Sequence, residues 1–305
     1  MLTRNMGLLL TTTASMVWGT TFVAADFGLR YTNPYNLLFM RFAVASAVAV
    51  PLAIAFGRLR ELRGELERSP VWLLGVIYAM GFLLQYMGQS LTNVGDATLL
   101  ANLAPVFVPG LAWFMTKESI TKSQIPITGL GLLGLVLIVW PDFGLGSRSL
   151  VGDLLLFGAS MSYALFVVMS KRLNAVSVGS GLALIIAVTV FLAPAAILLG
   201  KLNALDLEMG WTGWLYVVYL GVPCTVIAVA LYLKGMGSIS ASTSGMILLV
   251  EILTGLLLAT LLFRQVPTEY ELGASVAVLS ALGMSIFSSR QAKSIRTEAN
   301  MTSGA

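Results

Sequence analysis

Two ionisable residues lie inside long apolar segments, where a charged side chain is costly. Glu251 is near the middle of the run 238–263, and Arg41 follows Pro34 by seven residues in another run. A carboxylate at the centre of a bilayer costs about 2.5–3.5 kcal/mol on insertion scales, so such groups face protein or water. Glu251 could exchange protons or another cation, or it could be a structural acid that ties its helix to a neighbour. Arg41 could bind a substrate carboxylate through its planar guanidinium, or extend its head outward to the surface.

A second group combines uncharged polar side chains with aromatic rings in the apolar segments. Gln85 and Gln89 are four residues apart, which places both on one face of a helix. Uncharged donors and rings around a cavity suit a zwitterionic or partly apolar metabolite. The alternative is hydrogen bonding between helices, worth about 0.6 kcal/mol per bond. The predicted substrate-binding set is Trp18, Arg41, Gln85, Tyr86, Gln89, Asn102, Tyr163 and Tyr219, with Glu251 as the candidate coupling residue.

The composition places these residues in a membrane protein. Of the 305 residues, 57% are hydrophobic and 10% are charged, whereas soluble domains carry about 25% charged residues. The apolar runs are continuous instead of alternating, which indicates helices and excludes a transmembrane barrel. The net charge of +4 comes from short loops, so it indicates orientation in the membrane, with no nucleic-acid partner. Because the chain has no histidine and one cysteine, we expect no histidine-based catalysis, no metal site and no cofactor.

The pattern predicts an all-α membrane protein of ten transmembrane helices, with the N-terminal run kept as a helix instead of a cleaved signal peptide. If the N-terminus is cytoplasmic, the inner segments carry 13 Lys and Arg residues and the outer segments carry 4. This asymmetry predicts that both termini are cytoplasmic. Asp26 and Asp153 fall near outer helix ends and are candidate partners of Arg41. The predicted helices cover about 6–29, 34–56, 70–91, 96–115, 125–140, 150–170, 176–199, 211–233, 238–263 and 271–288.

An internal repeat relates the two halves of the chain. Ala14–Gly19 (ASMVWG) resembles Ala159–Ala164 (ASMSYA) at an offset of 145, and Tyr86 matches Tyr232 at an offset of 146. Five helices per half is an odd number, so the second half must enter the membrane from the opposite side. The predicted domains are an N-terminal five-helix repeat (1–142), an inverted C-terminal repeat (149–289) and a disordered cytoplasmic tail (290–305). Such halves enclose a midplane site, and we expect a cavity lined by the first, third and fourth helix of each half.

Two segments at corresponding places resemble a known family. Leu99–Trp113 (LLANLAPVFVPGLAW), followed by Glu118, is similar to the N-terminal half-signature of EamA-type members of the drug/metabolite transporter superfamily. Leu248–Leu258 (LLVEILTGLLL) is similar to its C-terminal partner, and the Trp-Gly pair at Trp18 also fits. The C-terminal segment departs from the pattern, because Ile252 stands where a proline is usual. The resemblance covers the whole chain and implies ten helices in two inverted halves and the export or exchange of amino acids and other small metabolites.

We therefore expect a secondary active transporter that exports or exchanges small metabolites, amino acids or similar zwitterionic solutes, by alternating access. It would lie in the cell inner membrane as a monomer, with protons as the coupling ion. Small-residue faces, such as Gly129, Gly131 and Gly134, usually mark close packing within a chain, and a dimer contact is the alternative. The competing function is a membrane enzyme or scaffold that acts on a small lipid-phase substrate. An enzyme would need a convergent catalytic set or a phosphate-binding Gly-Lys loop, and the sequence shows neither.

Overall fold

The computed structural model describes residues 3–116, 124–140, 148–173, 178–199, 208–236, 238–239, 241–264 and 267–284. Within these ranges the regular secondary structure is entirely helical. Among the described residues, seven helices are long and apolar enough to cross a membrane, and two shorter apolar helices cover Gln124–Val139 and Val250–Phe263. The expectation of an all-helical, multi-pass membrane protein is therefore confirmed at this level. The tail over 290–305 lies outside the described residues.

The described residues of the first half of the chain form seven helical elements. Helix starts follow local capping chemistry: the Asn33 side chain accepts the Asn36 N–H, and Pro34 occupies the first helical position, where its missing N–H costs nothing. Asn93 caps the helix that begins at Val94 in the same way: its side chain accepts the Asp96 N–H. The elements are α1 (Arg4–Leu29), α2 (Pro34–Ala55), α3 (Leu59–Leu66), α4 (Ser69–Gln89), α5 (Val94–Ala101), α6 (Ala104–Thr116) and α7 (Gln124–Val139).

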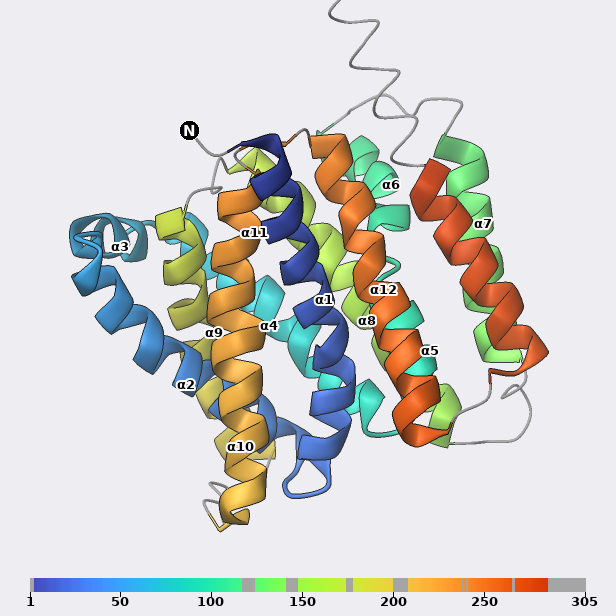
Figure 1. The fold of residues 1–305 in the computed structure, drawn as a ribbon, viewed down its shortest axis with the longest axis horizontal. Helices are drawn as coiled ribbons and strands as arrows, with labels where there is room; N and C mark the ends of the chain where they lie inside the picture. Colours follow the sequence, from blue (N-terminus) through green and yellow to red (C-terminus); the bar gives the residue numbers. More distant parts are fainter. Residues whose placement is uncertain are drawn as a thin grey trace, which may run out of the picture.

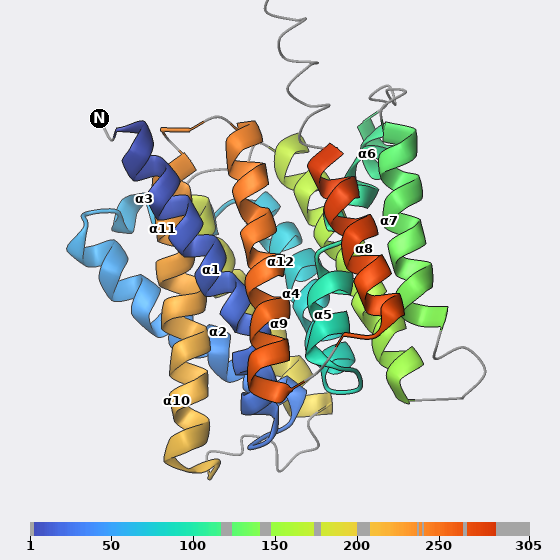
Figure 2. The same ribbon diagram turned by 45° about the vertical axis from the view of Figure 1, so that its right-hand side comes forward.

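The second half begins with α8 (Arg148–Arg172) and α9 (Val178–Leu199). A third long helix consists of α10 (Gly210–Gly221), the π-helical segment Val222–Ile227 and α11 (Ala228–Met236). It is followed by α12 (Ala241–Phe263) and by a helix over residues 269–284. Figures 1 and 2 show α1 and α12 side by side, with α4 and α8 behind them and α7 beside the last helix at one edge.

Two helices that the sequence predicts as continuous are interrupted. The predicted helix over 96–115 breaks at Asn102 and Leu103, between α5 and α6, two residues before Pro105. The predicted helix over 211–233 contains the π-helical segment, which holds Pro223. Both interruptions contain or adjoin a proline, whose missing N–H removes one bond of the helical ladder. π-helical turns are often found at functional sites.

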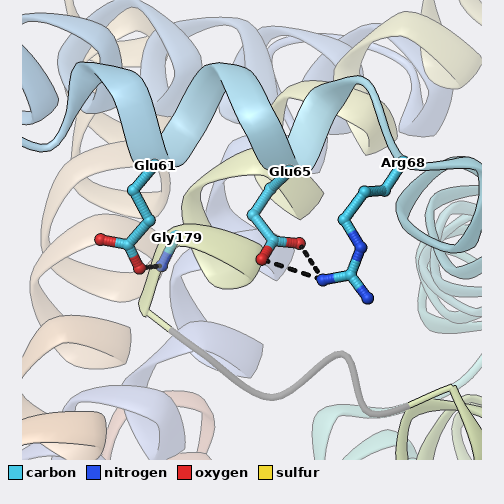
Figure 3. Close-up of polar contacts among 4 residues, drawn as sticks. All are labelled: Glu61, Glu65, Arg68 and Gly179. Atoms are coloured by element: carbon cyan, nitrogen blue, oxygen red, sulfur yellow. Dashed lines mark hydrogen bonds and ion pairs between the residues drawn. The ribbon is translucent and has the colours of Figure 1, made fainter.

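The charged segment over 58–68, between α2 and α4, contains the short helix α3. Leu62 on α3 is buried against Ala183 and Ala187 of α9, and Glu61 accepts the N–H of Gly179 in the first turn of α9 at 3.1 Å. Figure 3 shows this contact beside the Glu65–Arg68 ion pair, in which the closest N···O distance is 3.1 Å. A Cβ on Gly179 would lie 2.6 Å from the Glu61 side chain, so a larger residue there would force that side chain to move. Through these contacts, α3 of the first half packs against α9 of the second half.

Glycines bring the halves into close contact at both ends of the molecule. Gly88, at the end of α4, faces Gly152, at the start of α8, and a Cβ on Gly88 would meet the Gly152 carbonyl oxygen at 2.7 Å. Gly235, at the end of α11, faces Gly7, at the start of α1, and a Cβ on Gly235 would meet the Gly7 carbonyl oxygen at 2.9 Å. Small residues at such contacts let helix backbones approach closely within a membrane.

Candidate functional site

A cavity of about 520 Å³ lies between the two halves. Every helix expected to line it contributes residues, and α2 and α9 line it as well. Its outermost lining residues lie in the first turns of α4 and α9 and near the end of α8, so it extends toward the end of the molecule that carries the N-terminus and α3. Its polar and charged lining residues are Thr21, Arg41, Gln85, Asn102, Ser170, Ser180, Thr225 and Glu251.

Arg41 is a buried cation in the cavity wall, with 3% of its surface exposed. Its Nε donates to the Thr225 hydroxyl at 3.0 Å, and one terminal nitrogen donates to the Tyr86 hydroxyl at 2.9 Å. The guanidinium also lies 5.1 Å from the Phe82 ring centre and 5.5 Å from that of Phe42, close enough for cation–π attraction. Within the described part of the chain, Arg41 forms no ion pair.

Glu251 lies in the same cavity, where the helix over 94–116 is broken. Its carboxyl group is hydrogen-bonded to the Asn102 side chain, and the Asn102 amide also donates to the Thr98 carbonyl oxygen at 2.9 Å. Asn102 is the residue that follows α5, so the C-terminal end of that helix lies near the carboxyl group. The negative end of a helix dipole and a carboxyl group both favour a cation. No charged partner of Glu251 is present among the described residues.

Aromatic residues form the wall between these two groups. Tyr163 donates to the Gln85 side-chain oxygen at 2.5 Å, and its ring contacts those of Tyr78 and Phe82 at 5.6 Å. A Cβ on Gly81 would lie 2.5 Å from the Tyr163 ring, so the glycine provides the space in which the ring lies against α4. Trp18 packs on Tyr232 at 5.0 Å and donates its indole N–H to the Cys224 carbonyl oxygen at 3.1 Å.

Three of the predicted substrate-binding residues do not line the cavity. Tyr86 is fully buried behind Arg41, and Gln89 donates to the Phe22 carbonyl oxygen in the packed core. The Tyr219 hydroxyl bonds Thr20 at 2.7 Å. Their hydrogen bonds join helices to one another, which was the alternative role for polar groups in these segments. Trp18, Arg41, Gln85, Asn102, Tyr163 and Glu251 line the cavity together.

The acids proposed as partners of Arg41 have other contacts. Asp26 pairs with Arg30 at 3.1 Å on the same helix. Asp153 is buried and accepts the Thr92 hydroxyl at 2.9 Å. Both lie near the end of the molecule opposite to the N-terminus, away from the Arg41 guanidinium, so the predicted pairing is absent from this conformation.

Thr225, whose hydroxyl accepts from Arg41, is a cavity residue outside the predicted set. One signal was present: Pro223 stands two residues earlier inside an apolar run, and an interior proline disturbs the helix around it. The described residues also contain no group of three Cys, Asp or Glu side chains arranged to hold a metal ion.

The apolar helices and the cavity between them are those of a multi-pass membrane protein. The EamA-like transporter family matches residues 5–140 and again residues 150–287, so the chain belongs to this family. A protein of Archaeoglobus fulgidus described as an uncharacterized transporter is 27% identical over 79% of this chain and 84% of its own length. Solute carrier family 35 member G1 of Mus musculus is 27% identical over 71% of this chain and 52% of its own.

A solved structure shares the fold. A protein known from a crystal structure superposes with a TM-score of 0.66 at 20% sequence identity, and the match covers 93% of this chain and 98% of that one. The family and the names of the relatives indicate a transporter rather than an enzyme. The resemblance inferred from the segments around Leu99 and Leu248 is thereby confirmed.

Proposed function

We propose that this protein is a secondary transporter that exports or exchanges amino acids or similar zwitterionic solutes by alternating access. The observation that carries the proposal is Arg41, a buried cation that lines the cavity without an acidic partner among the described residues. A buried charge is unfavourable unless it is paired. A solute carboxylate that enters the cavity supplies the missing charge, and an arginine can bind it through two parallel hydrogen bonds.

Glu251, which lies beside the break between α5 and α6, can supply a charge opposite to that of Arg41. The same cavity holds a carboxyl group that lacks a charged partner in the described structure. A zwitterion presents one charge of each sign, and the rings of Tyr78, Phe82 and Tyr163 offer an apolar surface for the rest of the solute. When the solute is absent, a proton on Glu251 removes its charge. We therefore propose protons as the coupling ion, which compete with the solute ammonium group for this residue.

Pseudosymmetric contacts support an inverted repeat over 1–142 and 149–289. The glycine pair Gly88–Gly152 joins the end of α4 to the start of α8, and Gly235–Gly7 joins the end of α11 to the start of α1. In the sequence repeat, Gly7 of the first half corresponds to Gly152 of the second, 145 positions later, and Gly88 corresponds to Gly235, 147 positions later. These offsets are close to that of the sequence repeat, so the two glycine contacts are equivalent under the repeat. Halves related in this way can rock about a midplane site.

The remaining parts of the proposal follow from charge and packing. The excess of Lys and Arg in the segments on the side of the N-terminus supports a topology with both termini on the cytoplasmic side of an inner membrane. The cavity would then extend toward the cytoplasm, as an exporter that accepts its solute from inside requires. Gly131 and Gly134 contact Val106 and Val278 of the same chain, which supports a monomer as the transporting unit.

Transport in proteoliposomes tests the function. We expect wild-type protein to move one or more solutes from a panel of radiolabelled amino acids and other zwitterions. Replacement of Arg41 by Gln lowers that flux about thirtyfold or more, since the loss of one partner of a buried charge pair costs about 2 kcal/mol or more. Arg172→Gln removes an exposed arginine and serves as the control. Unchanged flux in Arg41→Gln, or no flux of any zwitterion in the wild type, would contradict the proposal.

A further inference from the structure

The Arg41 side chain has two hydrogen-bond acceptors, and each comes from a different half of the chain. Tyr86 lies on α4 of the first half and Thr225 in the π-helical segment of the second. Both acceptors are buried, with 0% and 5% of their surface exposed. An arginine carries five N–H groups, of which these two contacts use two. The other three form no hydrogen bond within the described residues, and the side chain borders the cavity.

The π-helical segment determines how Thr225 presents its oxygen. The Thr225 hydroxyl donates to the Leu220 carbonyl oxygen, five residues back, at 2.8 Å. Because its single proton is used there, its lone pairs remain to accept the Arg41 Nε–H. Widening of the helix also changes the backbone bonds. The Ala228 N–H donates to the Pro223 carbonyl oxygen, five residues earlier, and to the Thr225 carbonyl oxygen, three residues earlier. An α-helical turn would bring the Thr225 hydroxyl close to the carbonyl four residues back instead.

Close backbone packing holds this segment against α2. A Cβ on Gly221 would lie 2.7 Å from the Arg41 carbonyl oxygen, so only a glycine lets the two helices approach to this distance. The rings of Phe42 and Phe82 flank the guanidinium. These contacts restrict the side chain to one orientation and leave its free N–H groups for a ligand.

We propose that Tyr86 and Thr225, with the π-helical segment Val222–Ile227, form a frame that orients Arg41 so that its three remaining N–H groups select a carboxylate over an uncharged analogue. The proposal deepens the proposed function and rests on it for the transport role of the site. Tyr86 and Thr225 are positioning residues here, because they act through Arg41 and Tyr86 does not reach the cavity. The frame also couples the halves, since each supplies one acceptor.

Nuclear magnetic resonance of arginine side chains tests the hydrogen bonds of Arg41 independently of transport. Protein with ¹⁵N-labelled arginine is prepared in detergent micelles, and the Arg41 Nε–H signal is identified by its loss in Arg41→Lys. We expect a signal that is protected from exchange with water in the wild type. Thr225→Val, which removes the hydroxyl and keeps the shape, should accelerate exchange about tenfold or more. Thr225→Ser keeps the hydroxyl and should restore protection, while Thr260→Val is the control at a hydroxyl that bonds the Leu256 carbonyl oxygen on its own helix.

Selectivity is measured with benzoate and benzamide, which differ in charge and share an apolar ring. Benzoate should shift the Arg41 signal and benzamide should not. Thr225→Val and Tyr86→Phe should each weaken benzoate binding about tenfold. If Thr225→Val fails to fold, Tyr86→Phe decides the question, because it keeps the ring in the core. Unchanged exchange and unchanged benzoate affinity in these variants would overturn the proposal. A benzoate response in a protein that transports no zwitterion would instead contradict the proposed function and leave the frame intact.

Discussion

At the residue scale, the cavity contains a cation and a carboxyl group, each held by neutral partners. Arg41 is bonded to two hydroxyl groups, and Glu251 to the Asn102 amide. If the two groups formed an ion pair with each other, their electrostatic attraction for a charged ligand would be weak. Partners without charge instead orient each group and leave its charge available. This arrangement differs from a structural ion pair, in which the charges are used within the fold.

The role of Glu251 gives a prediction about the pH dependence of transport. Glu251→Gln keeps the shape and the hydrogen-bonding capacity but cannot exchange a proton. We expect the variant to fold and bind solute, and its flux to lose the response to an imposed pH gradient. The titratable and charged groups that share the cavity are Arg41, Tyr78, Tyr163, Cys224 and Tyr232.

Flux in proteoliposomes under inward and outward pH gradients checks this expectation. Glu269→Gln removes an exposed carboxylate on the last described helix and should leave the gradient response unchanged. If Glu251→Gln keeps the wild-type pH profile, the acid is structural. In that case Glu251→Ala, which also removes the bond to Asn102, should fold poorly.

At the scale of the elements, glycine contacts determine how closely the two halves pack. Gly88→Ala places a Cβ 2.7 Å from the Gly152 carbonyl oxygen, which forces α4 and α8 apart. Overpacking of this kind costs about 1–3 kcal/mol, so we expect a lower temperature of thermal unfolding in detergent. Gly129→Ala is the matched control, because a Cβ at that position meets nothing within 4 Å. Equal melting temperatures for the two variants would show that the α4–α8 contact adapts at no cost.

The interruptions in two long helices place polar side chains at the cavity. The break after α5 brings Asn102 to Glu251, and the π-helical segment brings Thr225 to Arg41. A regular helix satisfies its own backbone groups and shows only side chains to its neighbours. Irregular backbone at membrane depth is tolerated where it is enclosed in protein or lines a cavity. Both interruptions meet that condition.

At the scale of the whole molecule, the structure is closed at the end opposite to the N-terminus. Phe27 stacks on Tyr216 and Phe263 there, with ring centres 5.7 and 5.0 Å apart. Thr92, between α4 and α5, donates to Asp153 at the start of α8. None of these residues lines the cavity. The proposed alternating access requires these contacts to separate, so that the cavity can open to the other side.

A disulfide across this closed end should therefore stop the cycle. Thr92→Cys with Asp153→Cys, in a Cys224→Ala background, places two thiols where the native side chains lie 2.9 Å apart. We expect oxidation to abolish flux while solute still binds, and reduction to restore flux. The two single-cysteine variants, which cannot form this bond, are the controls. Full flux in the oxidised double variant would show that this end does not open during transport.

The apolar runs and the charges between them were sufficient to predict a multi-pass helical membrane protein. Length and hydropathy are local properties of a segment, and a helix in a membrane satisfies its own backbone groups. The paired segments around Leu99 and Leu248 were enough to identify the family. Arg41 and Glu251 were recognisable as functional candidates because a charge inside an apolar run is costly and is typical of a functional site.

Only the tertiary structure decided which polar residues face the cavity. Gln85 and Gln89 share a helix face and a chemistry, yet Gln85 borders the cavity while Gln89 bonds the Phe22 carbonyl oxygen. Thr225 bonds Arg41 across 184 positions of sequence. The helices are apolar on all sides, because lipid and protein interior are similarly apolar, so no polar stripe marks the inward face. The hydrogen-bond partners of each polar side chain therefore depend on how the two halves pack against each other.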